Sequence, residues 1–263
     1  MKSLKYVLCA TSLMVSAAAS AGPILIINGA DATTEVGTTS ALTANLKALH
    51  EAVGNTVTIV NSLFGDISSY SQVWDVRFFN AAALDVFAQT TYANYLGSGG
   101  GLFLMGENSS FMDRNNSILS LISQLGGGNI GFNSCFDGNQ VVHAPFTGPT
   151  PVTSVNYAAS GCFTSEGTGQ WITSRQDESM GAGIAFGTGT LSNAKAGALT
   201  TILDVNFMMN QFDLPNSQSL TKNLIGYIGE QVEPPSNDVP APATILLFAA
   251  GVVGLSLRMR QRS

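Results

Sequence analysis

Strand-like and helix-like patterns of apolar residues alternate through the first half of the chain. Residues 23–28 form a continuous apolar run, which is typical of a strand buried on both faces of a parallel sheet. Leucines then recur at helical spacing from Leu42 towards Val53, and Gly54 ends that pattern. Residues 56–60 are mostly β-branched, which again favours a strand. The predicted order is strand, helix, strand.

The same order repeats further along the chain. A strand is expected at residues 73–78, a helix at 85–96, a strand at 102–105 and a second helix around 118–125. Strands that alternate with helices in this way require right-handed crossovers between parallel strands. We therefore expect an α/β fold with a doubly wound, mostly parallel sheet.

Beyond these elements the pattern changes to short strand candidates separated by Gly, Ser, Thr and Pro. They lie near residues 141–144, 171–174, 182–186 and 198–205. We interpret them as a β-rich, loop-rich C-terminal portion, either inserted or appended. A last helix at residues 217–230 carries one apolar stripe and is expected to pack back on the sheet.

The N-terminus has the pattern of a secretory signal peptide. Lys2 and Lys5 precede an apolar stretch, and small residues lead to Ala21. We predict cleavage after Ala21, which removes residues 1–21 together with Cys9. The alternative, a first core helix, would need polar residues on one face.

The C-terminus has three successive parts. Residues 233–238 contain two adjacent prolines and predict an extended linker. The tetrapeptide VPAP at residues 239–242 leads into an uncharged run at 243–257, which is a short candidate for a transmembrane segment. Three arginines follow, and the positive-inside rule keeps them in the cytoplasm.

This tail, residues 239–263, closely resembles the PEP-CTERM sorting signal of Gram-negative bacteria, although Ala241 stands where an acidic residue is usual. The resemblance implies an exosortase-type sorting protease as a partner. It also implies transient membrane anchoring, followed by a cell-surface or extracellular location. A plain C-terminal anchor is the alternative. Under either interpretation residues 22–232 are exported, and we expect them to fold as one domain.

The composition of this exported part argues against one class of partner. Charged residues make up only 11% of the chain. Between residues 22 and 238, 6 Lys and Arg oppose 17 Asp and Glu, which gives a formal charge of −11. Because phosphate binding needs a basic footprint, we expect no nucleic-acid partner.

Four segments invite comparison with a known family: PILIING, VWDVRFFN, GGGLFLMGEN, and LDVNFMMN with NLIGYI. Together they resemble the class I glutamine amidotransferase-like fold, a flavodoxin-like sandwich, over residues 23–229. In catalytic members the strand matching residues 102–105 leads into a Gly-x-Cys-x-Gly turn, whose thiolate pairs with a histidine. Here the turn reads Gly106-Glu107-Asn108-Ser109-Ser110 and has no thiol. Neither His50 nor His143 has an evident nucleophile to activate, so we do not expect an amidotransferase reaction.

Polar residues gather where the predicted parallel strands end. Carboxyl ends of such strands meet at one edge of the sheet, where ligands bind in open α/β folds. Arg77 ends an apolar strand, so its burial calls for a carboxylate partner, and we expect Glu107 in that role. The alternative to a ligand site is a structural Arg–carboxylate pair that fixes the loops. The expected binding residues are Asp31, Arg77, Asn80, Glu107, Asn108, Arg114 and Asn115, with Asn28 beside them.

Cys135 and Cys162 are the only cysteines left after the signal peptide is removed. Export brings them into an oxidising compartment, so we expect a disulfide between them, with two free buried thiols as the alternative. The sequence has no metal-ligand spacing of the HExxH, CxxC or EF-hand type. We expect neither a metal nor a cofactor.

Two hypotheses of function follow. The first is an exported, cell-surface or matrix-associated domain without catalysis, for which the resemblance to the sorting signal implies exopolysaccharide as a candidate partner. The second is an exported hydrolase that uses the Glu107 carboxylate as base or nucleophile at the carboxyl edge of the sheet. The missing thiol favours the first hypothesis, because a fold alone does not establish an activity.

Overall fold

The computed structural model describes residues 22–28, 39–76, 82–135, 138–204, 208 and 214–232. The expected signal peptide, linker and sorting tail lie outside these residues, and so do Asp31, Arg77 and Asn80. Within the described ranges, no helix has the length and apolar character needed to cross a membrane.

Strands and helices alternate in the first half of the chain, as the sequence pattern predicts. Val53, expected on the apolar face of the first helix, lies just beyond the end of that helix and is 59% exposed. The elements are, in chain order, β1 (Pro23–Ile27), α1 (Thr39–Ala52), β2 (Thr56–Val60), β3 (Gln72–Asp75), α2 (Val86–Gly97), β4 (Gly101–Met105), the 3-10 helix η1 (Ser109–Phe111), α3 (Met112–Gln124), β5 (Phe132–Ser134), β6 (Asn139–Val142), β7 (Ser154–Asn156), β8 (Gly161–Phe163), β9 (Gln170–Ser174), β10 (Gly183–Phe186), β11 (Ala198–Ile202) and α4 (Leu214–Gln231).

A nine-stranded sheet forms the centre of the described structure, in the order β2-β1-β3-β4-β11-β10-β9-β6-β7. Strands β2, β1, β3, β4 and β11 are parallel to one another. Beyond β11 each strand runs antiparallel to its neighbour. The parallel part has the order 2-1-3-4-5 of a flavodoxin-like sheet, with β11 as its fifth strand. The predicted α/β class is confirmed.

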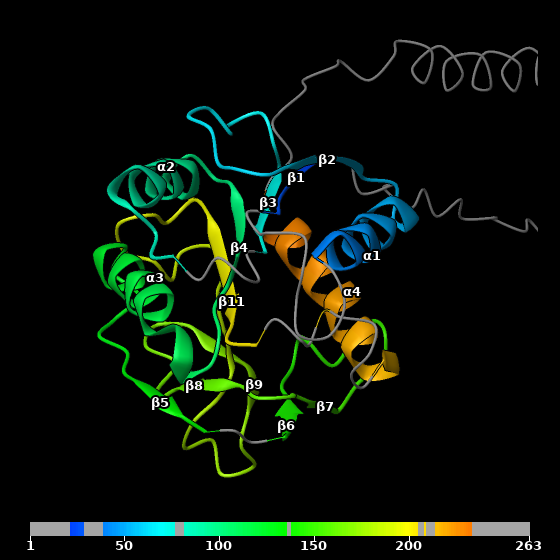
Figure 1. Cartoon of the computed structure of the whole chain (residues 1–263), viewed down its shortest axis with the longest axis vertical. Helices are drawn as coiled ribbons and strands as arrows, with labels where there is room; N and C mark the ends of the chain where they lie inside the picture. The colour runs from blue at the N-terminus through cyan, green and yellow to red at the C-terminus, as the bar shows by residue number, and fades with distance from the viewer. Residues whose placement is uncertain are drawn as a thin grey trace, which may run out of the picture.

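Two helices cover each face of the parallel strands (Figure 1). Helices α1 and α4 lie on one face, and α2 and α3 lie on the other. Side chains alternate accordingly: Ile24 and Ile26 pack on the side of α1 and α4, whereas Leu25 and Ile27 pack on the side of α2 and α3. A strand covered on both faces needs apolar residues throughout, which explains the continuous apolar run in β1.

The β-rich portion is inserted between α3 and β11. Strands β6, β7, β9 and β10 extend the main sheet beyond β11, while β5 and β8 form a separate two-stranded sheet. The sequence grouped residues 198–205 with this portion, whereas β11 pairs with β4 as a parallel strand of the main sheet. That grouping was wrong because the position of β11 depends on a partner far away in the sequence, which no local pattern reveals.

A buried histidine lies between α1 and the sheet. The ring of His50 meets that of Trp74 edge to face, with centroids 5.1 Å apart, and its Nδ1 lies 3.1 Å from Asn55 Nδ2. Trp74 stacks in turn on Phe103. Burial lowers the pKa of His50 from 6.5 to about 3. The ring is therefore neutral in the folded protein, and Nδ1 accepts a hydrogen bond from the Asn55 amide.

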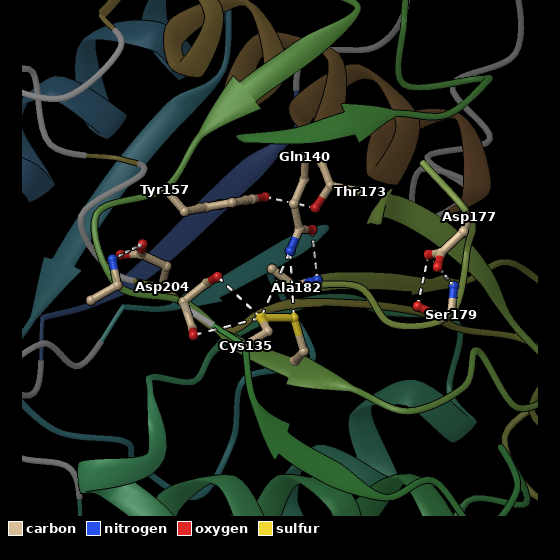
Figure 2. Close-up of a disulfide and its surroundings, with 11 residues drawn as sticks. Cys135, Gln140, Tyr157, Thr173, Asp177, Ser179, Ala182 and Asp204 are labelled. Carbon is tan, nitrogen blue, oxygen red and sulfur yellow. Dashed lines mark hydrogen bonds between the residues drawn. A yellow bond between two sulfur atoms is a disulfide. The ribbon is translucent and has the colours of Figure 1, made fainter. Parts of the chain in front are cut away.

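The expected disulfide joins Cys135 and Cys162, with the Cα atoms 5.6 Å apart (Figure 2). Cys162 lies in β8 and is fully buried. The Gln140 side chain of β6 lies beside the two sulfurs, with Nε2 3.4 Å from Cys162 Sγ, and its Oε1 accepts a 2.9 Å hydrogen bond from Ala182 N–H. The disulfide and Gln140 together connect the small sheet to the extended part of the main sheet.

We predict that His50 destabilises the fold in acid. Its folded pKa lies below its unfolded value of 6.5, so the unfolded chain binds a proton that the folded chain does not. The stabilising contribution of the neutral ring is complete above about pH 6.5 and is lost as the pH falls towards 3. Urea unfolding measures the free energy of unfolding of wild type and of His50→Gln. The difference between the two should become smaller as the pH falls from 6.5 towards 3. A constant difference for His50→Gln would contradict the assignment.

The second prediction concerns the disulfide. It closes a loop with a sequence separation of 27, and losing it should lower the free energy of unfolding by about 3 kcal/mol in the chain-entropy model. Urea denaturation of the exported protein should show the same loss for the double variant Cys135→Ala with Cys162→Ala and for the reduced wild type. Alkylation of both thiols in unreduced, exported protein would disprove the bond.

Candidate functional site

Parallel strands β1, β3, β4 and β11 end together at one side of the sheet, called the carboxyl edge from here on. Asp75 is the last residue of β3, while Glu107 and Asp204 each lie two residues beyond the ends of β4 and β11; all three are buried. Because Met105 and Ile202 are register partners, Glu107 and Asp204 follow on at equivalent positions of neighbouring strands. Three acidic residues of a charge-poor chain are thus concentrated at this edge.

Asn115 of α3 holds the turn that follows β4. Its Nδ2 donates to the backbone oxygens of Glu107 at 2.7 Å and Asn108 at 3.1 Å, and its Oδ1 accepts from Glu107 N–H at 3.0 Å. A Cβ on Gly106 would lie 2.9 Å from Asn115 Oδ1, so glycine allows this close approach. Asn108 caps η1, because its Oδ1 accepts from Ser110 N–H at 2.9 Å. Both asparagines organise the backbone of the turn.

Arg114 makes a buried ion pair with Asp75. The Arg114 Nη2 and Asp75 Oδ1 atoms lie 3.3 Å apart, and the two side chains are 1% and 0% exposed. Tyr92 of α2 donates its hydroxyl to Asp75 Oδ2 at 2.6 Å, and Arg114 Nε donates to Met105 O at 3.1 Å. This network joins β3, α2, α3 and β4. The sequence analysis missed Asp75, although an acidic residue at the end of an otherwise apolar strand was a signal for it.

The structure brings some of the expected site residues together. Glu107 and Asn108 lie in one turn with the side chain of Asn115 between them, and Arg114 precedes Asn115 on α3. Arg77 lies outside the described residues, so its expected contact with Glu107 stays a prediction. The same holds for the roles expected of Asp31 and Asn80.

Several buried polar atoms at the carboxyl edge have no hydrogen-bond partner among the described residues. They include Nη1 and Nη2 of Arg114, although the Asp75 carboxylate compensates the charge, and Oδ1 of Asn28 at the end of β1. Buried polar atoms in native proteins almost always have a partner. A ligand oxygen on Arg114 and a ligand donor on Asn28, or ordered waters in both places, would satisfy these atoms.

The β-rich insertion forms one wall of the carboxyl edge. Gly161 N–H donates to Leu203 O at 2.9 Å, and Asp204 Oδ2 accepts a 3.3 Å hydrogen bond from Ala159 N–H (Figure 2). Tyr157 is buried beside them, with its hydroxyl oxygen 2.8 Å from Thr173 Oγ1. Burial raises the pKa of Tyr157, and the Asp204 carboxylate adds to that rise. The phenol therefore stays neutral at ordinary pH.

A second polar cluster joins β6 and β9. His143 Nε2 lies 2.8 Å from Ser174 Oγ, and His143 Nδ1 lies 4.0 Å from Glu178 Oε1. The sequence analysis found no nucleophile for His143, and the structure corrects this by placing a serine beside it. Ser174 is fully buried, however, and its hydroxyl donates to Arg175 O at 2.7 Å. Because that proton is already engaged, the imidazole donates to Ser174, and the cluster fixes a turn instead of activating a nucleophile.

The rim of the carboxyl edge carries exposed apolar side chains. Val86 and Phe87 at the start of α2 are 80% and 50% exposed, and Met112 at the start of α3 is 36% exposed. Asn108 and Ser109 lie partly exposed just before Met112. Asp85, which precedes Val86, and Asp113, which follows Met112, are also exposed. The rim therefore combines apolar surface, neutral hydrogen-bonding groups and two carboxylates.

Residues 238–261 match the family described as the PEP-CTERM protein-sorting motif. This match confirms the sorting signal recognised in the tail. Such a signal implies export, sorting by an exosortase and transient membrane anchoring. The sequence matches no curated protein.

Solved structures similar to this chain share its fold at very low sequence identity. The N-terminal domain of mmIFT52 has a TM-score of 0.55 at 12% identity, covering 77% of this chain and 95% of that one. The cytoplasmic protein STM1381 from Salmonella typhimurium LT2 has a TM-score of 0.51 at 12% identity, covering 78% and 99%. The cold-adapted β-galactosidase from Rahnella sp. R3 has a TM-score of 0.50 at 11% identity, covering 82% of this chain but 32% of that one. At such identities the likeness extends to the fold alone.

Proposed function

We propose that residues 22–232 form one exported, amidotransferase-like domain that binds a ligand at the carboxyl edge without catalysis. The turn after β4 carries this proposal. Catalytic members of the family that the chain resembles carry a thiol in this turn. Here the turn contains Glu107 and Asn108, and the side chain of Asn115 forms hydrogen bonds with their backbone. The turn is thus built as a rigid part of a binding edge, while the sorting tail delivers the domain to the cell surface or the surrounding matrix.

The attachment of the tail supports an outward-facing carboxyl edge. Helix α4 ends at the opposite edge of the sheet, since a Cβ on Gly101, the first residue of β4, would lie 3.1 Å from Val232 Cγ1. The start of β1 lies at that edge too, because Ser71 N–H donates to Pro23 O at 2.9 Å. A tail that continues from Val232 therefore leaves the carboxyl edge facing away from the membrane attachment.

The chemistry of the rim fits a neutral polysaccharide as ligand. Hydroxyl groups of a sugar both donate and accept, which suits Asn108 and Ser109, while its C–H faces pack against apolar side chains such as Phe87 and Met112. Residues 22–238 carry a formal charge of −11, from 6 Lys and Arg against 17 Asp and Glu, so an acidic polymer would be repelled. A matrix polysaccharide is a ligand that an exported surface domain meets at high local concentration.

We expect Phe87→Ala to weaken binding of a neutral oligosaccharide. Removing a half-exposed aromatic ring from a binding rim costs about 1 kcal/mol or more, roughly a fivefold to tenfold rise in Kd. Isothermal titration of the processed protein with cellohexaose, maltohexaose and chitohexaose would measure this, with oligogalacturonate as the acidic comparison. Short oligosaccharides are used because a long polymer can bind several protein molecules at once, which would raise the apparent affinity.

Phe64→Ala is the matched control, because Phe64 is also an exposed aromatic residue, at 39%, but lies after β2. Its affinity should equal that of wild type. If Phe64→Ala and Phe87→Ala lose affinity equally, the oligosaccharide contacts exposed aromatic rings nonspecifically. Tight binding of the acidic oligosaccharide alone would contradict the proposed ligand class.

The alternative, a carboxylate hydrolase, draws its support from the adjacent positions of Glu107 and Asp204 on neighbouring strand ends. Paired carboxylates are the usual machinery of glycoside hydrolysis. Reducing-end release from the same oligosaccharides, abolished by Glu107→Gln but unaffected by Phe64→Ala, would replace the binding proposal with this one.

Processing of the tail provides a further prediction. In a host that contains the matching exosortase, the mature chain should begin near Gly22 and end near Val239, having lost both the signal peptide and the arginine-rich end. Intact-mass measurement of the exported protein checks this. A mature chain that still carries Arg258 in such a host would support a plain anchor instead.

A further inference from the structure

The disulfide has one accessible sulfur and one buried sulfur. Cys135 directly follows β5 and is partly exposed, whereas Cys162 in β8 is 0% exposed. The course of thiol–disulfide exchange depends on which of the two sulfurs an attacking thiolate can reach. An external thiol therefore meets Cys135 first.

Gln140 of β6 directs its amide group at this bond (Figure 2). Its Oε1 accepts a 2.9 Å hydrogen bond from Ala182 N–H, and a backbone N–H can only donate, so the amide is fixed in one orientation. The NH2 group faces the sulfurs, with Nε2 3.4 Å from Cys162 Sγ and 3.9 Å from Cys135 Sγ. Gln140 is 1% exposed, and among the described residues its Nε2 has no hydrogen-bond partner besides these two sulfurs.

A disulfide sulfur is a poor partner for a buried amide. Neutral sulfur accepts hydrogen bonds weakly, whereas a hydrogen bond to a charged acceptor is roughly twice as strong as one between neutral groups. The Gln140 amide therefore interacts more strongly with a thiolate at Cys162 than with the closed bond. It offsets the cost of placing charge on a buried sulfur, which makes Cys162 a better leaving group.

We propose that the Cys135–Cys162 bond is a site of thiol–disulfide exchange, entered at Cys135 and assisted by Gln140, with an external dithiol as the co-reactant. One thiolate of the dithiol attacks Cys135 Sγ and forms a mixed disulfide. The bond to Cys162 breaks, and its electron pair leaves on Cys162 as a thiolate beside Gln140. The second thiolate of the reagent then attacks the reagent sulfur of the mixed disulfide and releases Cys135. The dithiol is oxidised by two electrons, and the protons that it lost go to the two cysteines.

Opening this bond loosens one wall of the carboxyl edge. Cys162 follows Gly161, whose N–H donates to Leu203 O at 2.9 Å, and a Cβ on Gly161 would lie 2.7 Å from Glu107 O. Strand β8 thus packs directly against the segments that follow β4 and β11. Reduction removes the covalent link between β8 and the segment after β5. An effect on ligand affinity at this edge rests on the proposed function, whereas the exchange itself does not.

Trapping with glutathione tests the point of entry and needs no variant. Folded, exported protein is treated with glutathione, its free thiols are blocked with N-ethylmaleimide, and the peptides are mapped by mass spectrometry. Glutathione should be found on Cys135 and the maleimide on Cys162. Glutathione mainly on Cys162 would overturn the proposal. A bond that opens only in urea would overturn it too, because exchange would then require unfolding.

Two substitutions of Gln140 test the role of the amide. Gln140→Met removes the donors at similar volume, and Gln140→Glu keeps an oxygen for Ala182 N–H. Each should slow opening of the folded protein by dithiothreitol at least about tenfold, because a hydrogen bond to a charged sulfur is lost. Looser packing would instead speed opening, so the sign of the change separates assistance from a structural role. Rates equal to or faster than wild type in both variants would overturn the assistance.

Ser160→Ala is the matched control. The buried Ser160 hydroxyl lies 3.5 Å from Cys135 Sγ, so this variant removes a polar group beside the attacked sulfur and leaves the amide at Cys162 in place. Its opening rate should stay close to that of wild type. Circular dichroism confirms that each variant is folded, and opening in urea, where all chains should react alike, corrects for the reagent.

Amide hydrogen exchange checks the structural consequence. Reduced protein should exchange faster than oxidised protein in residues 132–134 and 159–163, while β1 and β3 keep their protection. This readout involves no ligand, so its failure is distinct from a failure of the proposed function. Equal exchange in the two states would overturn the proposed loosening of the wall.

Discussion

The buried pair of Asp75 and Arg114 determines how the carboxyl edge is built. Asp75 ends β3, Arg114 belongs to the first turns of α3, and Tyr92 brings α2 into the same network. Burying two charges carries a desolvation penalty that their attraction barely repays, so apolar residues of similar volume would give comparable stability. Removing one partner alone would cost about 3–5 kcal/mol, because the other charge would stay buried without compensation. The pair therefore fixes positions more than it adds stability.

Those positions decide what the edge can do. Arg114 is held by Asp75 and by the carbonyl of Met105, so the start of α3 cannot shift against β4. Asn115 is thereby placed to bind the backbone of Glu107 and Asn108. A turn fixed in this way presents its side chains with little conformational freedom, which lowers the entropic cost of binding. The ion pair, the turn and the proposed rim thus act as one unit.

The sequence could predict much of the fold because the relevant signals are local. Continuous apolar runs identified β1 and β4, and helical spacing identified α1, α3 and α4. The site was less accessible to this reasoning. The pairing of Asp75 with Arg114 depends on a contact between β3 and α3, and the contact of His143 with Ser174 joins two strands brought together by the insertion. Neither periodicity nor composition specifies which distant residues meet.

The expected pairing of Arg77 with Glu107 also shows that a sequence pattern does not specify which distant residues meet. The expectation that Arg77 pairs with Glu107 stays a prediction, but the same physical rule, that a buried cation needs a carboxylate, is seen at Arg114 of α3. The carboxylate that pairs with Arg114 is that of Asp75, the last residue of β3, and not that of Glu107 in the turn beyond β4. Glu107 lies in the turn two residues beyond β4, where Asn115 of α3 binds its backbone. Asp75 is thus committed to a structural ion pair at the end of β3, whereas Glu107 follows the end of the neighbouring strand β4, close to the start of α3 and the proposed rim.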